Sequence, residues 1–255
     1  MSVSVAIAVA AALAVIVFLF ARGRKQQQSE SDGAMAALGM EAVSALDPAL
    51  TAAIIALHRP PAPGTTIKQT WSLTRILRYP EPGATCYSVT VHLEQEREVQ
   101  RTGTAHRFET RDARVVAVVA PATLQAPRMH LMPRAIIDPA SGALVKMAAE
   151  AANALTDEAA EQSGDRVEFA DDAAFERRYL VLSPAYGPAR AFLDPTRRQE
   201  LAALDGVQIS LEGSLMLVSS PADAIRHRDR SLEESLRAEL ENARRVLTVL
   251  RATPL

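Results

Sequence analysis

The chain has 255 residues, and its 30 acidic and 28 basic side chains leave a formal net charge of −2. This mildly acidic balance argues against nucleic-acid binding, because a basic surface supplies most of the affinity for phosphates. The single cysteine excludes a disulfide bond within the chain.

The chain begins with an apolar segment at residues 1–21. Val3–Phe20 contains neither a charged residue nor a proline. As a helix it would span about 27 Å, close to the roughly 30 Å hydrocarbon core of a bilayer. Three basic residues follow between positions 22 and 25, and basic residues beside a span stay on the cytoplasmic side. We therefore expect an uncleaved, single-pass helix in the lipid bilayer of the cell inner membrane, with residues 26–255 in the cytoplasm. A cleaved signal peptide and a buried helix are the alternatives.

Residues 22–64 are expected to form a juxtamembrane tether that contains a short helix. Gln26–Met40 is polar and then rich in small residues, as in a flexible linker. Asp47 and Pro48 mark a helix start, and apolar residues follow on one face at intervals of three to four positions.

Residues 65–134 form the β-rich part of the predicted domain. The segment 66–79 is favoured as a strand, and the segment 86–96 alternates apolar and polar side chains, as a half-buried antiparallel strand does. The segments 105–121 and 128–133 complete this part as two further strands.

Residues 135–226 are expected to form an α+β module that ends in a β-hairpin. Pairs of a capping residue and a proline predict helix starts, because the cap oxygen accepts an orphan N–H and proline at the first helical position lacks a donor that would have no partner. From residue 178 the predicted order is strand, helix, helix, strand, strand. The last two strands form a hairpin over 206–220, with Glu212 and Gly213 at its turn. The pairs are Asp138-Pro139, Ser183-Pro184, Asp194-Pro195 and Ser220-Pro221.

Residues 227–255 are predicted to form the C-terminal helix. Ser231 and Glu234 have the spacing of a capping box. Apolar residues between Leu236 and Leu250 recur at alternating intervals of four and three positions. This stripe has to be covered, either by the chain's own domain or by a helix of a partner protein.

The sequence contains no motif for a cofactor or a metal, and we predict neither. Its eleven glycines lie at least six residues apart, so there is no glycine-rich phosphate-binding loop. The histidines do not show the spacing of metal ligands, although His92 and His106 could approach each other across a hairpin. The five histidines are His58, His92, His106, His130 and His227.

Two groups of residues are candidates for catalysis. Cys86 lies at a strand start, where a lone cysteine is usually part of the core. An acidic cluster precedes the strand at residue 178, and paired carboxylates can perform acid–base chemistry when one of them is desolvated. Helix capping and solvation explain the same residues without chemistry. The cluster consists of Asp165, Glu168, Asp171 and Asp172.

The segment 171–204 carries an extended pattern: Asp-x-x-Phe, a strand ending in Ser, a helix with Ala-Arg, and a Leu-x-Pro turn, followed later by a hairpin with Gly. The matching residues are Asp172 (or Asp171 in an alternative register), Phe175, Tyr179, Val181, Ser183, Ala189, Arg190, Leu193, Pro195 and Gly213. This pattern resembles a bacterial family of membrane-anchored proteins that share a domain of unknown function. The resemblance covers residues 171–219, with a looser echo at 115–133. It implies a membrane-tethered α+β domain facing the cytoplasm and carries no catalytic residue onto this chain, which has one span where two are common in the family.

These observations predict an α+β fold: a single N-terminal transmembrane helix, then a soluble domain of antiparallel strands with short helices and a C-terminal helix. The favoured function is a binding or scaffold module at the inner membrane, with an unidentified protein partner and no nucleic acid. The alternative is an enzyme whose site is assembled from scattered polar residues such as Asp171, Asp172 and Arg190.

Overall fold

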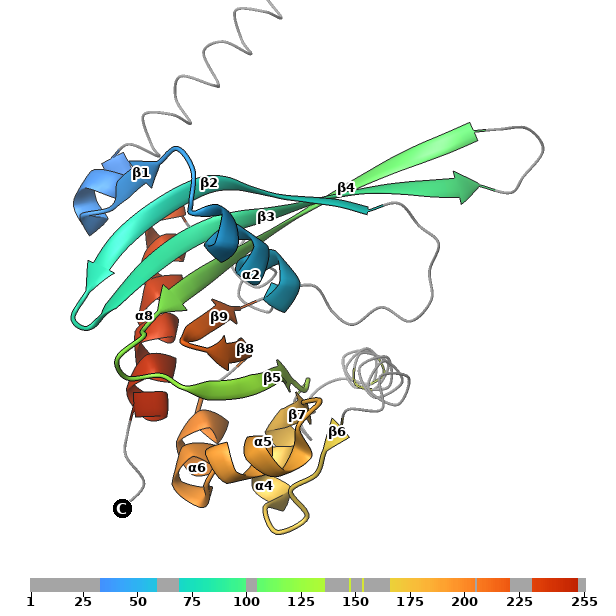
Figure 1. Ribbon diagram of the computed structural model, residues 1–255, viewed down its shortest axis with the longest axis vertical. Coiled ribbons are helices and arrows are strands. Elements are labelled where there is room, and N and C mark those ends of the chain that lie inside the picture. Colours follow the sequence, from blue (N-terminus) through green and yellow to red (C-terminus); the bar gives the residue numbers. More distant parts are fainter. Residues whose placement is uncertain are drawn as a thin grey trace, which may run out of the picture.

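The described residues of the chain fold around one antiparallel sheet of nine strands (Figure 1). The computed structural model describes residues 33–58, 69–99, 105–135, 147, 153, 166–204, 206–220 and 231–251. The strand order is β1-β2-β3-β4-β9-β8-β5-β7-β6, and every neighbouring pair is antiparallel. The strands are β1 (Glu41–Val43), β2 (Gln69–Glu81), β3 (Ala84–Val99), β4 (Ala105–Val119), β5 (Ala126–Pro133), β6 (Arg166–Val167), β7 (Tyr179–Leu182), β8 (Gln208–Gly213) and β9 (Leu215–Ser219).

Helices cover both faces of the sheet. The long helix α8 lies on one face, and α2 lies on the other (Figure 1). Three short helices, α4, α5 and α6, contribute to the same core as α8, at the end of the sheet formed by β5, β7 and β6. The helices are α2 (Pro48–His58), α4 (Ala173–Arg178), α5 (Tyr186–Phe192), α6 (Pro195–Ala202) and α8 (Leu232–Arg251).

The β8–β9 hairpin lies in the middle of the sheet, although it comes late in the chain. β9 pairs with β4, and β8 pairs with β5. β4 and β5 are consecutive along the chain, but two later strands separate them in space. The sheet therefore runs across the boundary placed between residues 134 and 135, and both predicted parts contribute strands to it.

The fold class expected from the sequence is wrong as stated. We expected a transmembrane helix followed by an α+β domain, whereas the described residues form one nine-stranded antiparallel sheet with few helices. No helix among them is long and apolar enough to cross a membrane. The periodicity of single strands could not reveal that the strands of both halves share one sheet. Residues 1–21 lie outside the described residues, so the expected inner-membrane location, bilayer contact and orientation stay predictions.

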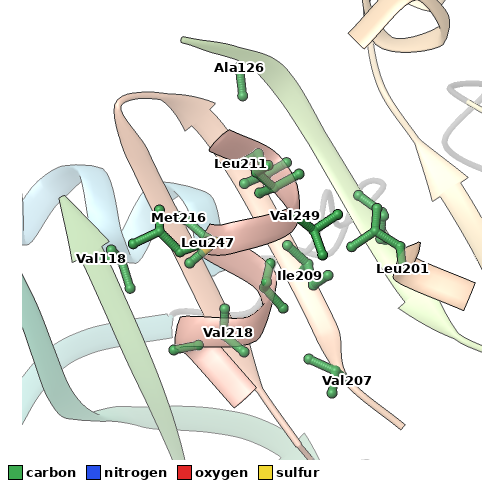
Figure 2. Packing of buried hydrophobic residues seen from close by; sticks show 14 of the residues in the cluster. Val118, Ala126, Leu201, Val207, Ile209, Leu211, Met216, Val218, Leu247 and Val249 are labelled. Carbon is green, nitrogen blue, oxygen red and sulfur yellow. The ribbon is translucent and has the colours of Figure 1, made fainter. Parts of the chain in front are cut away.

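The larger core lies between the sheet and α8. Met216 and Val218 of the hairpin are buried in this core, and Figure 2 shows Met216 beside Leu247 of the helix. The leucine stripe of the C-terminal helix thus packs on the chain's own sheet. This is the first of the two alternatives, in which the chain's own domain covers the stripe. The buried residues of α8 are Leu236, Leu240, Ala243, Val246, Leu247, Val249 and Leu250.

A second core lies on the opposite face, beneath α2. Ile54 and Leu57 of this helix are fully buried and pack against apolar side chains of β3, β4 and β9. Leu215 and Leu217 of the hairpin belong to this cluster. The strand β9 is therefore buried on both faces, which explains why all four of its first residues are apolar.

Helix starts follow the capping signals, with one displacement. Asp47 accepts hydrogen bonds from the backbone N–H groups of Ala49 and Leu50 at the start of α2, and Asp194 caps α6. Ser183 instead accepts from the N–H of Ala185 at 3.2 Å, and α5 begins only at Tyr186. The pair at 138–139 and Pro221 lie outside the described residues.

The hairpin turn lies one residue later than predicted, because Glu212 pairs directly with Leu215. Gly213, the first of the two turn residues, has a φ of +57°. A positive φ is the conformation that glycine adopts without strain.

The segment 33–43, which lies within the expected tether, belongs to the folded domain. Residues 33–38 are helical, and Ala34 and Met40 are buried in the core beneath α8. β1 then pairs with β2, with Val43 opposite Ile76. These contacts fix residues 33–43 of the expected linker to the edge of the sheet.

β2 contains a β-bulge. Between the paired residues Thr74 and Leu77, two residues of β2 (Arg75 and Ile76) oppose one residue of β3. Arg75 has a φ of 49°, in the left-handed region that non-glycine residues rarely occupy. Such a bulge bends a strand and increases its local twist, so the outer edge of β2 is irregular at this point.

Candidate functional site

The acidic residues near α4 gather around a buried arginine. Arg198 on α6 donates from Nε to Asp172 Oδ2 at 3.0 Å and from Nη2 to Asp171 Oδ2 at 2.9 Å. Arg190 on α5 donates from Nη2 to the other oxygen of Asp171 at 2.7 Å. The structure thus brings together the three residues of the enzyme hypothesis and adds Arg198, which the sequence analysis missed.

Further contacts fix each member of this cluster. Asp172 uses its Oδ1 to cap α4, accepting from the N–H of Phe175 at 3.0 Å. Arg198 is only 4% exposed, and its guanidinium lies over the ring of Phe169 at 5.0 Å. Arg190 donates to the backbone carbonyl of Glu168 at 3.0 Å. Glu168 therefore takes part through its backbone, and Asp165 lies outside the described residues.

The electrostatics of the cluster favour a structural role. A hydrogen bond from its own backbone N–H, followed by Arg198 and Arg190, lowers the pKa of Asp171. A general acid or base at neutral pH needs a pKa near 7, so the shift runs in the wrong direction for that chemistry. The carboxylates and guanidiniums neutralise one another and tie α4, α5 and α6 together.

One sequence signal could have identified Arg198. The helix that begins after Asp194 places Leu201 on its buried face, and Arg198 lies three residues earlier on the same face. A buried arginine needs a carboxylate partner, and the acidic residues Asp171 and Asp172 are candidates for that partner in the sequence.

The histidines lie apart from one another along the β3–β4 ladder. His92 is opposite Asp112, whereas His106 is opposite Glu98, so the two histidines do not face each other. His92 Nδ1 hydrogen-bonds Asp112 Oδ1, which raises the pKa of His92. Within the described part of the chain, no group of three or more His, Cys, Asp or Glu residues could hold a metal ion.

A serine and a histidine form a pair beneath α2. His130 Nδ1 lies 2.9 Å from Ser210 Oγ, and desolvation by burial, followed by the charge of Arg128, lowers the pKa of His130 to about 4. A nucleophile and base at this distance are a starting point for acyl transfer. Ser210, however, is only 4% exposed, so a substrate cannot reach its hydroxyl group in this conformation. The pair satisfies two polar groups inside the domain.

Cys86 belongs to the core beneath α8. Burial, followed by the charge of Glu81, raises the pKa of the Cys86 thiol to about 11. A thiol of this pKa is protonated at neutral pH and is a poor nucleophile. The structure thus places Cys86 where the core interpretation expected it.

The outer edge of β4 has no partner among the described strands over most of its length. β3 pairs with β4 along its whole length, from Ala105 to Val119. β9 pairs with the other edge only from Val116 to Val119. In Figure 1, β3 and β4 continue together well past the body of the sheet. The backbone N–H and C=O groups on this edge of Ala105–Val115 are therefore not used by any described strand.

On the α8 side of the strand, the side chains described beside this edge are exposed and polar. Thr110, Asp112 and Arg114 follow one another at every second position on the α8 side of the strand. Asp112 is held by His92, and Arg114 Nη1 lies 3.4 Å from Glu239 Oε1 on α8. The edge is thus accessible from the α8 side.

Other edges of the described sheet are short or irregular. The two outermost strands, β1 and β6, have three and two residues. The outer edge of β2 carries the bulge at Arg75. The β3–β4 ladder, in contrast, shows no shift in register from Val99 to Thr85. Short strands and bulges protect edges against pairing with other chains, and the β4 edge lacks both.

The chain matches no protein-family model, no curated protein and no solved structure. The resemblance described for residues 171–219 therefore stays a prediction, and function has to be argued from the described residues alone.

Proposed function

We propose that this protein is a protein-binding module that takes up an extended segment of a partner along the free edge of β4. The observation that supports it is the regular edge of Ala105–Val115, with which none of the described strands pairs. Strand addition to such an edge is a common mode of recognition, in which backbone hydrogen bonds supply affinity and alternate side chains supply specificity.

The rest of the domain suits a scaffold for this edge. β4 continues from the free stretch into the centre of the sheet, where Val116, Ala117 and Val118 are fully buried. A bound strand would therefore be anchored to the core of the domain through β4. The enzyme alternative has less support, because Asp171, Asp172 and Arg190 neutralise one another within the Arg198 cluster.

A site-specific crosslink tests this function. A photo-crosslinking amino acid replaces Thr110 beside the free edge, and in a matched control it replaces Thr196, which is exposed on α6. We expect one polypeptide to be captured through position 110 and not through 196. That polypeptide, identified and purified, should slow amide hydrogen exchange in β4. Equal capture at both positions, or unchanged exchange, would contradict the proposal.

A further inference from the structure

We infer that α2 is an acid-sensitive cover of the sheet: when the histidines at its C-terminal end take up protons, the helix leaves the sheet while the rest of the domain stays folded. This inference goes beyond the proposed function, because it concerns one face of the sheet and does not depend on the edge of β4. Release of α2 would uncover the second core, whose buried strand residues include Val89, Val91 and Leu217.

Three basic side chains gather at the C-terminal end of α2. His58 is the last residue of the helix, and Arg128 of β5 donates from Nη2 to the backbone carbonyl of Ala56 at 3.2 Å. His130 lies two residues further along β5, on the same face, with its Nδ1 2.9 Å from Ser210 Oγ. Desolvation by burial, followed by the charges of Arg128 and His58, lowers the pKa of His130. The three groups therefore lie close enough to repel one another when all of them are charged.

No carboxylate in the described part of the chain forms an ion pair with these three side chains. Neither α2 nor β5 contains an acidic residue, and β9 contains no titratable one. On β8, Glu212 is on the same face as Ser210 but is exposed. The other titratable side chains described on this face are Asp47, which caps α2, the ion pair of Arg78 with Glu41, and Tyr87. Positive charge added at this end of α2 would therefore stay uncompensated.

The arrangement is favourable only while the two histidines are neutral. Arg128 is then the one charged member of the three, and a single cation is stabilising at a helix C-terminus, where the backbone carbonyls carry partial negative charge. His58 and His130 are half-buried, so desolvation opposes their protonation, and the charge of Arg128 adds to this cost. Moving α2 away from the sheet lets water reach both imidazoles and relieves the two costs.

The packing of α2 allows it to open in a step of its own. The helix buries two side chains, Ile54 and Leu57, whereas α8 buries seven. Elements with few buried apolar contacts open locally at a lower free energy than the rest of a fold. Destabilisation at the C-terminal end of α2 should therefore release this helix before α8 and the sheet are lost.

The size of the effect follows from His130. Its pKa is about 4 with α2 in place and about 6.5 once the imidazole is in water. Proton linkage then raises the equilibrium constant for opening α2 by about 50-fold between pH 7 and pH 4.5. Desolvation by burial also lowers the pKa of His58, so protonation of this residue acts in the same direction.

Amide hydrogen exchange on the full chain tests the inference. Protection factors, which correct for the slower intrinsic exchange in acid, are measured for α2 and α8 at pH 7 and pH 4.5. We expect the protection of α2 to fall about 50-fold and to be lower than that of α8 at pH 4.5. Equal protection of the two helices at pH 4.5 would mean that both are lost in one global step. Either that result or an unchanged protection of α2 would overturn the inference.

Two histidine variants identify the group that takes up the proton. His130→Gln keeps a polar side chain beside Ser210 and should remove most of the acid-induced loss of protection in α2. His92→Gln is the matched control and should keep the whole loss, because His92 lies on the α8 side of the sheet beside Asp112. An equal loss in His130→Gln and in the parent chain would overturn the inference. If His130→Gln fails to fold, the comparison of α2 with α8 in the parent chain decides by itself.

Discussion

Arg244 on α8 and Glu81 at the end of β2 form an ion pair with 2.8 Å between Nε and Oε2, although 163 residues separate them. Arg244 also lies over the ring of Tyr79 at 4.9 Å. Two helical turns further on, Arg251 donates to the backbone carbonyls of Pro82 and Gly83 at 3.2 and 2.9 Å. The last helix of the chain is therefore fastened to the first hairpin of the sheet.

Ending the chain after residue 230 should abolish cooperative folding. The seven buried side chains of α8 contribute about 1.5–3 kcal/mol for each of the larger ones, which together rivals the whole stability of a typical domain, about 5–15 kcal/mol. Urea denaturation followed by circular dichroism measures the effect. Arg244→Ala is the control for the exposed ion pair and should lower the free energy of unfolding by only about 0.5 kcal/mol. An unchanged midpoint in the truncated chain would show that the helix is not structural.

Phe175→Ala should lower the free energy of unfolding by about 3–5 kcal/mol. Phe175 is fully buried between Phe169 and Tyr179, with ring centroids 5.3 and 5.6 Å away. Phe192 at the end of α5 is only partly buried and has the guanidinium of Arg197 4.7 Å from the centre of its ring. Phe192→Ala should therefore cost about 1 kcal/mol. Equal losses for the two variants, measured by thermal denaturation, would contradict the difference in burial.

Arg198→Ala should destabilise the protein by about 3 kcal/mol, because it leaves two carboxylates beside an emptied buried position. Arg190→Ala removes a more exposed partner of the same Asp171, so we expect a loss below about 1 kcal/mol. Chemical denaturation of both variants at pH 7 gives the comparison. A larger loss of stability for Arg190→Ala than for Arg198→Ala would contradict the conclusion that Arg198 is the central arginine of the cluster.

Stability should fall as the pH drops from about 6.5 to 4, in part because of His130. Its pKa is about 4 in the folded protein against an ordinary value of 6.5, so in this range the unfolded chain binds a proton that the folded chain does not. The free energy of unfolding should be lower at pH 4.5 than at pH 7 by about 2–3 kcal/mol from this residue. His130→Gln, which keeps a polar group beside Ser210, should reduce the pH dependence by that amount. An identical pH profile in the variant would refute the assignment.

The sequence predicted most individual elements, because their signals are local. The alternation in 86–96, the Asp47 and Asp194 caps and the Ser231–Glu234 capping box all correspond to observed structure. The hairpin over 206–220 was also found, one residue out of register at its turn.

The arrangement of those elements could not be read from the sequence. Pairing of Val116 with Val218 and of Leu131 with Ile209 joins residues far apart in the chain, and alternation does not specify which strands are neighbours. The cluster around Arg198 shows the same limit. The sequence indicates its acidic members, but the identity of their arginine partner depends on how α6 packs. The free edge of β4 results from its short overlap with β9, and no local pattern in the sequence predicts that overlap.

The central place of the β8–β9 hairpin has a consequence for synthesis on the ribosome. Seven of the described strands precede it along the chain, and it is the inner neighbour of both β4 and β5. A nascent chain that ends before residue 208 therefore carries two partial sheets with open inner edges, the kind of exposed backbone that favours misassembly. The sheet closes only when this hairpin has been made, so both inner edges stay open while the residues between β5 and β9 are synthesised.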